Sequence, residues 1–367
     1  MFTPHLLPLM RRSAISLAII ATLAACGGGS RGDLPGLPGG GGKTLEVACA
    51  AQSDPRLQEM TDSGIGLTSA LGLASGRYAL PTTSAPTQLV VMFHGNHNDS
   101  CSWRQHLQNV AALGAVTVAM DYTGQRQTPV EHYGWFVRGG AADSIAAAQY
   151  FMARYPSIKE VFALAVSMGG NTSGLAIASP DAVRADGTPL FDYWVVAEGA
   201  HNLIEEYNII RAVAPAVPAA VIAQQEIEEE NGGAFEDVPD RYVEITNVAR
   251  VADMAGLKGA VLVHGIDDGL VPTNQSREMF LALTANGVTS HLYTLGANGG
   301  AESGTTATAI PLGPVFGALG QAYESPLAGH GWEGSQTHLV MRTLLDQLYA
   351  LMAGGSIAPG ETVVPGV

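Results

Sequence analysis

One serine stands where a strongly apolar segment gives way to glycine. Residues 161–166 read VFALAV, a short apolar run typical of a strand that is buried on both faces. Ser167 follows directly, and Gly169 and Gly170 allow a sharp turn before a segment of small residues typical of a packed helix. A serine at such a junction presents its hydroxyl above the sheet, and the helix N-terminus favours negative charge beside it. The pattern predicts a nucleophile that attacks a carbonyl carbon; an ordinary Ser-Gly loop is the alternative.

Candidates for a base and an acid follow later in the chain, and a serine nucleophile needs both. Residues 259–265 predict another buried strand, and Asp267 and Asp268 lie just beyond it. His330 stands between two glycines, before the last helical pattern. The order Ser, Asp, His is the order of the triad in α/β-hydrolases and differs from the other two common orders.

Apolar runs and helical patterns alternate along the chain and place these residues at one edge of a sheet. Buried strands are expected at residues 88–93, 115–120, 161–166, 193–197, 259–265 and 291–295, and helices at about 140–153, 171–179, 276–285 and 337–352. The alternation predicts an α/β fold with a mostly parallel sheet and helices on both faces. Active sites of such sheets lie at the carboxyl ends of the strands, where Ser167 and the two aspartates fall.

Two segments are expected to be inserted into this fold. Residues from about 200 to 245 contain apolar positions at helical spacing, interrupted by Pro215 and Pro218, and predict a helical cap. Residues from about 297 to 328 are rich in Gly, Thr and Ala and are expected to form a flap beside the opening.

The stretch HGIDDGLVP, from His264 to Pro272, carries a family resemblance. Residues 85–352 resemble an α/β-hydrolase, and this stretch is similar to the catalytic domain of the prolyl-oligopeptidase-like and carboxylesterase branch. In that branch the catalytic aspartate lies three residues after the strand-end glycine, which implies Asp268, with Asp267 as a neighbouring loop acid.

The chain departs from the family pattern in two places. Ala165 replaces the glycine that usually precedes the nucleophile, as it does in some members, and the insertion at 297–328 is longer than usual. The resemblance implies His330, in its Gly-His-Gly setting, as the base. His338 is the alternative.

Acyl transfer through Ser167 also requires two donors for the tetrahedral oxyanion. The expected donors are the backbone N–H groups of Met168, the residue after the nucleophile, and of Asn96, in the loop after the strand 88–93. His94 and His264 are expected to be structural.

Aromatic residues near these positions have two interpretations. Tyr122, Trp135 and Phe136 could line an acyl pocket or pack in the core, and Trp332, beside His330, is expected at the rim of the cleft.

Charge and residue spacing argue against nucleic-acid binding and against a zinc site. The net charge is −15, with only 18 Lys and Arg in 367 residues, which argues against nucleic-acid binding. No His or Cys spacing resembles a zinc site, so no metal and no cofactor are expected. The acidic residues between 226 and 237 are interpreted as a solvated helix face and turn.

The first residues form a targeting segment. Arg11 and Arg12 precede an apolar stretch at 14–21 that is too short to span a bilayer, and Cys26 ends the run. This resembles a bacterial lipoprotein signal, which implies a lipidated Cys26 and an exported protein anchored at the cell envelope. Gly27 after the cysteine suggests the outer membrane. An ordinary secretory signal is the alternative.

The sequence is accordingly divided into four parts. Residues 1–25 are expected to be the signal peptide, 26–42 a Gly-rich tether, 43–355 the catalytic domain, and 356–367 a C-terminal tail. Cys49 and Cys101 would then share an oxidising compartment and are expected to form a disulfide; two separate buried thiols are the alternative.

These observations lead to an exported serine hydrolase that cleaves carboxylic esters, as an esterase, lipase or polyester depolymerase. A prolyl-oligopeptidase-like peptidase is the alternative within the same chemistry. Such peptidases carry a propeller domain. Only about 45 residues lie between the tether and the first strong strand, which is too few for a propeller and therefore favours the esterase. A tethered binding protein with an inactive site is the alternative of a different class.

Overall fold

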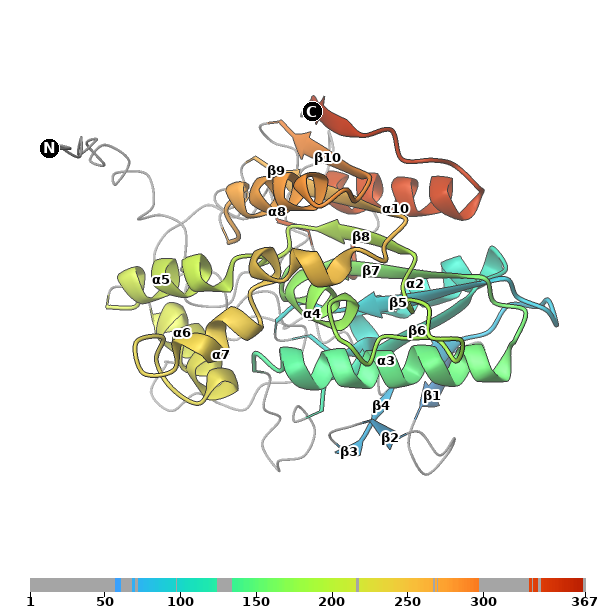
Figure 1. Ribbon diagram of the computed structural model, residues 1–367, viewed down its shortest axis with the longest axis horizontal. Helices are drawn as coiled ribbons and strands as arrows, with labels where there is room; N and C mark the ends of the chain where they lie inside the picture. Colours follow the sequence, from blue (N-terminus) through green and yellow to red (C-terminus); the bar gives the residue numbers. More distant parts are fainter. Residues whose placement is uncertain are drawn as a thin grey trace, which may run out of the picture.

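A nine-stranded sheet forms the centre of the described part of the chain (Figure 1). The computed structural model describes residues 57–60, 68–69, 72–96, 98–123, 134–215, 218–266, 268, 270–296, 330–331, 333–335 and 338–365. The strands are β1 (Leu57–Met60), β4 (Ser75–Ala79), β5 (Gln88–Phe93), β6 (Val116–Asp121), β7 (Glu160–Val166), β8 (Tyr193–Ala197), β9 (Gly259–Gly265), β10 (Ser290–Leu295) and β11 (Gly360–Val364). A separate antiparallel pair joins β2 (Thr68–Ser69) to β3 (Gly72–Leu73).

The sheet is parallel except at one edge. The strand order is β1-β4-β6-β5-β7-β8-β9-β10-β11. β1 and β4 pair antiparallel to each other, and β4 pairs antiparallel to β6. From β6 to β11 every pair is parallel. The mostly parallel α/β architecture expected from the sequence is therefore confirmed.

The central strands are apolar throughout because both of their faces are covered. Along β7, Val161, Ala163 and Ala165 belong to one hydrophobic core. The alternate residues Phe162, Leu164 and Val166 belong to another. This is the period of two that a pleated strand imposes on its side chains.

Helices cover the two faces unequally (Figure 1). α2 (Arg104–Ala112) and α10 (Leu339–Met352) pack on one face and contribute residues to its core. α3 (Val137–Arg154), α4 (Met168–Ile177) and α8 (Asn274–Ala285) pack on the other. The short 3-10 helices η4 (Ser100–Trp103), η5 (Asn247–Ala249) and η6 (Val251–Met254) connect these elements.

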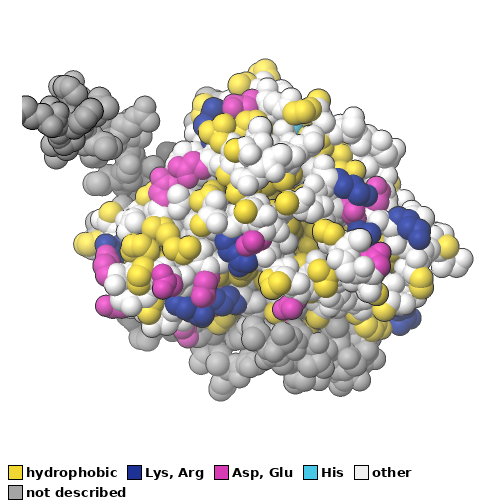
Figure 2. Space-filling view, viewed as in Figure 1, with side chains coloured by type: hydrophobic (Ala, Val, Ile, Leu, Met, Phe, Trp, Pro, Cys, Tyr) yellow, Lys and Arg dark blue, Asp and Glu magenta, His cyan; other side chains and the backbone are white. Residues whose placement is uncertain are grey.

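Three helices occupy the range expected to form the cap. They are α5 (Leu203–Val213), α6 (Pro218–Asn231) and α7 (Pro239–Glu244). They share a core of their own, in which Tyr207, Ile227 and Tyr242 are fully buried. On their outer side opposite charges lie next to each other, as in the pairs Arg211–Glu236 at 2.5 Å and Arg241–Glu244 at 3.0 Å (Figure 2).

The end of the chain differs from the sequence analysis. Residues 356–367 were expected to be a tail, but they contain β11, which extends the sheet beside β10. Three of the five side chains of β11 are exposed, so the segment lacks the apolar pattern that announces a strand. Within the described residues, no helix has the length and apolar character that crossing a bilayer requires.

Candidate active site

Ser167 occupies a strained turn between β7 and α4. Its φ is 58° and its ψ is −129°, a backbone conformation that residues other than glycine rarely adopt. Its N–H donates to the carbonyl of Ala197 at 3.0 Å, and its own carbonyl accepts from Gly170 N–H at 2.8 Å. These bonds hold the turn in place, so the strand–turn–helix geometry expected at Ser167 is confirmed.

Glycine is required beside Ser167 because neighbouring backbone lies very close. A Cβ on Gly169 would lie 2.2 Å from the carbonyl oxygen of Phe93, and one on Gly170 would lie 2.5 Å from Cα of Gly199. A Cβ on Gly95 would lie 3.2 Å from the Cβ of Ser167. The loop after β5 therefore lies directly against the serine.

Asp268 and His330 form a buried hydrogen-bonded pair. The Nδ1 of His330 lies 2.8 Å from Oδ2 of Asp268, and both side chains are inaccessible to solvent. The other oxygen, Oδ1, accepts from the N–H groups of Leu270 at 2.8 Å and Val271 at 3.1 Å. Burial acts to raise the pKa of Asp268, but His330 and His264 together outweigh it and hold that pKa below its ordinary value.

The sheet brings the ends of β7 and β9 close together. Val166 is paired with Ala197 across β7 and β8, and Ala197 with Val263 across β8 and β9. Neighbouring strands lie about 4.8 Å apart, so the ends of β7 and β9 are roughly 10 Å from each other. A histidine above the end of β8 can therefore serve both. Nδ1 of His330 lies 3.5 Å from Oε2 of Glu198, the residue that follows β8; its contact with Ser167 stays a prediction.

The expected oxyanion donors flank the serine. Met168 is the first residue of α4, where an N–H has no acceptor within the helix. Asn96 is buried in the loop after β5, and its Nδ2 donates to Oε2 of Glu226 at 3.0 Å. The side chain of Asn96 thus ties this loop to the cap helix α6. The role of both residues as oxyanion donors stays a prediction.

The other histidines have structural contacts. His264 is fully buried, with Nδ1 2.7 Å from Oγ of Ser276 and Nε2 2.8 Å from the carbonyl of Val271. His94 stacks on the ring of Tyr122 with centroids 3.8 Å apart. His338 precedes α10 and donates its N–H to Oγ of Ser335. Two histidine rings reach Oδ2 of Asp268: His330 through Nδ1 at 2.8 Å and His264 through Nε2 at 3.2 Å.

The aromatic residues that could have lined a pocket are packed. Tyr122 is 1% exposed and donates its hydroxyl to the carbonyl of His94 at 3.1 Å. Trp135 is 3% exposed and donates Nε1 to Oδ1 of Asn171 at 3.2 Å. Both belong to the core that they share with the cap helices, which favours the packing interpretation.

Several predicted residues lie outside the described part of the chain: Cys26, Cys49, Asp267, Trp332 and the insertion 297–328. Cys101 is described and is buried, at 3% exposure. Its pairing with Cys49 stays a prediction.

Buried acids are the feature that the sequence analysis missed. Glu198, Glu206 and Glu333 are each at most 1% exposed. Glu333 accepts from Gly95 N–H and from Nδ2 of Asn98, and burial raises its pKa to about 7. A signal was present for Glu198, because it directly follows a buried strand, as Asp267 and Asp268 nearly do.

The acidic stretch at 226–237 also requires a correction. It was interpreted as a solvated face, but Glu226 is 6% exposed and binds Asn96. Glu230 is also largely buried and accepts from the backbone N–H of Arg138 at 2.9 Å. The solvated interpretation holds for Glu236, whose side chain is 56% exposed.

One group of side chains could geometrically hold a cation. Ligand atoms of Glu198, Asp268 and His330 lie within 4.8 Å of one another. The same atoms already form hydrogen bonds within the protein, from His330 to Asp268 and from Gly331 N–H to Glu198. We therefore describe the group as a hydrogen-bond network.

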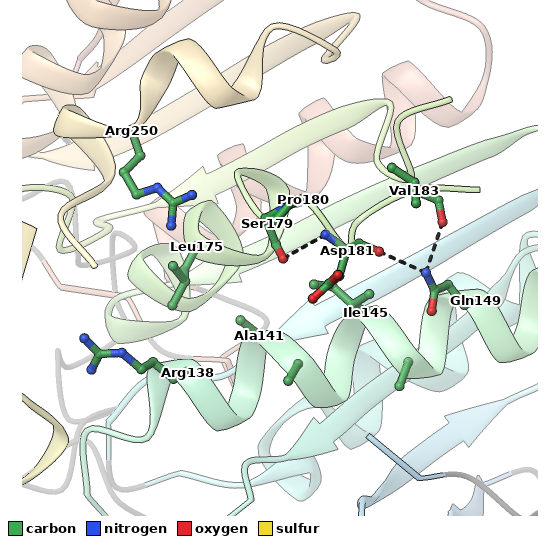
Figure 3. A pocket seen from close by; sticks show the side chains of 12 residues that line it. Arg138, Ala141, Ile145, Gln149, Leu175, Ser179, Pro180, Asp181, Val183 and Arg250 are labelled. Atoms are coloured by element: carbon green, nitrogen blue, oxygen red, sulfur yellow. Dashed lines mark hydrogen bonds between the residues drawn. The ribbon is translucent and has the colours of Figure 1, made fainter. Parts of the chain in front are cut away.

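A cavity lies elsewhere, between α3 and α4 (Figure 3). Its volume is about 600 Å³, with Ile145 and Leu175 on its wall and Arg138 and Arg250 toward one end. Across it, Gln149 donates to the carbonyls of Asp181 and Val183. None of its lining residues belongs to the site around Ser167.

The likenesses to known proteins come from solved structures. A scan of protein-family models and a search of the curated proteins found no match. Among solved structures, the chain is similar to an acylaminoacyl peptidase of Pyrococcus horikoshii, with 14% identity, a TM-score of 0.52, and coverage of 83% of this chain and 42% of that one. It is also similar to a puromycin-hydrolyzing peptidase of Mycobacterium tuberculosis, with 16% identity, a TM-score of 0.52, and coverage of 85% and 42%.

The chain is also similar to an esterase, and it covers a larger share of that protein's length. The thermophilic esterase of the Planctomycetes species Thermogutta terrifontis, with butyrate bound, has 17% identity, a TM-score of 0.51, and coverage of 83% of this chain and 97% of that one. The chain thus spans less than half of the length of the two peptidases and nearly all of the length of this esterase. Together with the strand order, these likenesses show the α/β-hydrolase fold.

Proposed function

We propose that this protein is a serine hydrolase that cleaves carboxylic esters through an acyl-enzyme. The observation that supports this most is that two features share the carboxyl edge of the sheet. Ser167 lies in a strained turn at the end of β7, and a buried Asp268–His330 pair follows β9, with β8 between the two strands. This is the arrangement that a serine nucleophile, its base and its orienting acid require.

The roles follow from the contacts of each group. With Nδ1–H donated to Asp268, His330 keeps Nε2 as the acceptor for the proton of Ser167 Oγ. Oγ then bonds to the carbonyl carbon, and the carbonyl electron pair moves to the oxyanion. When the oxyanion collapses, the bond to the leaving alcohol breaks, and the alcohol takes the proton from His330. Water repeats the sequence on the acyl-enzyme and releases the acid.

The oxyanion would be stabilised by the N–H groups of Met168 and Asn96. Removal of one such donor typically costs about 3–4 kcal/mol of transition-state stabilisation. The Asn96 loop is held by hydrogen bonds from Gly95 to Glu333 and from Asn96 to Glu226, which supports a preorganised donor there.

Esters are favoured over peptides by the extent of the likenesses. The described fold corresponds to nearly the whole of the Thermogutta esterase but to less than half of either peptidase. A peptidase remains the second candidate because peptidases and esterases share this fold and chemistry.

Activity profiling tests the proposal. Purified protein is assayed with p-nitrophenyl esters of increasing acyl length and with aminoacyl-arylamides, alongside a Ser167→Ala variant as the background. We expect ester cleavage that Ser167→Ala removes. Cleavage of the arylamides alone would establish the peptidase, and no activity on either class would favour the binding protein with an inactive site.

We further propose export and attachment to the cell envelope through a lipid on Cys26, and a disulfide between Cys49 and Cys101. The lipoprotein-like pattern that ends at Cys26 and the burial of Cys101 support these two proposals. The intact mass of protein from the membrane fraction, before and after reduction and alkylation, tests both. Unlipidated soluble protein would contradict the anchor, and alkylation of two thiols without reduction would contradict the disulfide.

A further inference from the structure

Glu198 places a second carboxyl group at the imidazole of His330. It directly follows β8 and is fully buried. Its Oε2 lies 3.5 Å from Nδ1 of His330 and accepts the N–H of Gly331. Its Oε1 lies 3.3 Å from the N–H of Gly265, at the end of β9. One side chain thus joins the backbone that carries His330 to the strand that precedes Asp268.

The backbone of Glu198 is strained in the same way as that of Ser167. Among the described residues other than glycine, only Ser167 and Glu198 have positive φ, at 58° and 53°. For a residue other than glycine, a positive φ costs on the order of 1 kcal/mol or more, and such residues cluster at functional sites. Glycine or asparagine would relieve that strain, so the presence of glutamate indicates that its carboxyl group matters.

We propose that Glu198 is a positioning residue for His330, and that it is the second acceptor for the Nδ1–H, able to replace Asp268. In the intact protein it fixes the His330–Gly331 backbone through the Gly331 N–H. When the carboxylate of Asp268 is removed, Glu198 accepts the Nδ1–H and keeps Nε2 directed at Ser167. The inference deepens the proposed function and rests on it, because it concerns the orientation of the proposed base.

The surroundings shift the pKa values of Glu198 and Asp268 in opposite directions. Two carboxyl groups this close do not both ionise readily. Burial, followed by the charge of Asp268, raises the pKa of Glu198 well above its ordinary value, whereas the pKa of Asp268 is lowered. The charges of Asp268 and His330 act on Glu198, while His264 lies 3.2 Å from Oδ2 of Asp268 and the charge of Asp268 also acts on Glu206. Of the two carboxyl groups, Glu198 is the one whose ionisation the surroundings oppose.

Loss of the Asp268 charge makes Glu198 easier to ionise. Without that neighbour, one of the causes that raise the pKa of Glu198 disappears, and Glu198 ionises at a lower pH. The ionised Glu198 is then a competent acceptor for Nδ1–H. Activity of a variant that lacks Asp268 is expected to increase with pH as Glu198 loses its proton.

A double-mutant cycle tests the inference, with kcat/KM measured against pH on the best ester. Glu198→Gln alone is expected to lower kcat/KM several-fold, because its amide NH₂ must face one of two backbone N–H donors. Asp268→Asn is expected to lower it by about 10- to 100-fold, against the roughly 10⁴-fold loss when a triad acid without a substitute is amidated. The double variant, Asp268→Asn with Glu198→Gln, should lower kcat/KM by about 10⁴-fold, and its kcat/KM should no longer rise with pH.

The matched control is Glu206→Gln. Glu206 is also a fully buried acid near Asp268, but its contact is with Nε2 of Gln275 and not with His330. In the Asp268→Asn background it should add no further loss. If Glu198→Gln adds no more than Glu206→Gln does, or if Asp268→Asn alone loses about 10⁴-fold, the inference is wrong.

Proton NMR gives a readout that needs no turnover. A carboxylate that accepts the Nδ1 proton of His330 should shift its signal far downfield. We expect this signal in the wild type and in Asp268→Asn, and we expect it to be absent from the double variant. Loss of the signal already in Asp268→Asn would overturn the role of Glu198. An inactive wild type that keeps the expected NMR pattern would instead overturn the proposed function and leave Glu198 as the second acceptor.

Discussion

The interior of the sheet and its carboxyl edge bury opposite kinds of side chain. Between the helices, β5, β7 and β9 bury apolar side chains almost without interruption. In the loops and helices that follow the strands, acids are buried: Glu198, Glu206, Glu226, Asp268 and Glu333. Apolar burial stabilises the fold directly, whereas a buried acid must be hydrogen-bonded or protonated to be tolerated.

The difference shows how each region is specified. The interior needs only apolar residues of suitable size at the right period. The edge needs particular partners, such as the N–H groups of Leu270 and Val271 for Asp268, and those of Gly265 and Gly331 for Glu198. Stability should therefore respond to substitutions in the interior, and activity and pH dependence to substitutions at the edge.

The largest effect is expected where the two regions meet, at Gly169. A Cβ there would lie 2.2 Å from the carbonyl oxygen of Phe93, and backbone cannot move away easily. Gly169→Ala should lower the free energy of unfolding by more than about 4 kcal/mol and disrupt the turn at Ser167. Urea unfolding and labelling by a serine-reactive fluorophosphonate measure the two effects. A variant of wild-type stability would show that α4 is not held as closely to β5 as described.

A substitution inside the core should separate stability from chemistry. Leu344 on α10 is fully buried against the sheet, and Leu344→Ala should lower the free energy of unfolding by about 2–5 kcal/mol. The control, Leu281→Ala, removes a leucine that is 56% exposed and should change it by less than about 0.5 kcal/mol. The folded fraction of both variants should react with the fluorophosphonate at the wild-type rate. Slower labelling of folded Leu344→Ala would mean that the interior also sets the site geometry.

A smaller effect, with a defined pH dependence, is expected at Glu206. Burial, followed by the charges of Asp268 and Glu205, raises its pKa to about 8. Between the ordinary pKa of glutamate and this value, the folded state holds a proton that the unfolded state has lost, so this contribution to stability decreases as pH rises. Glu206→Gln removes that decrease.

The stability of Glu206→Gln relative to the wild type should therefore rise by on the order of 2 kcal/mol between about pH 5 and about pH 9. Urea unfolding at both pH values measures the change. Glu278→Gln, on an exposed position of α8, is the control and should show no such rise. A flat difference for Glu206→Gln would place an ionised carboxylate in the cap.

The interior could be predicted from sequence and much of the edge could not, for the same physical reason. Apolar runs such as residues 88–93 and 259–265 correspond to β5 and β9 without a shift of boundary. Ser167, Asp268 and His330 were found because they adjoin such runs or glycines. Glu198, Glu226 and Glu333 were missed as site residues because partners distant in sequence, such as Asn96 for Glu226, determine their burial.

The central claim is that Ser167 is the nucleophile, activated by His330 and Asp268. The most direct test is labelling of the folded protein with a fluorophosphonate, followed by mass spectrometry of the labelled peptide. We expect the label on Ser167, and we expect Ser167→Ala to abolish it while far-ultraviolet circular dichroism stays unchanged. Labelling of Ser167→Ala at the wild-type rate, or a label on another serine, would contradict it.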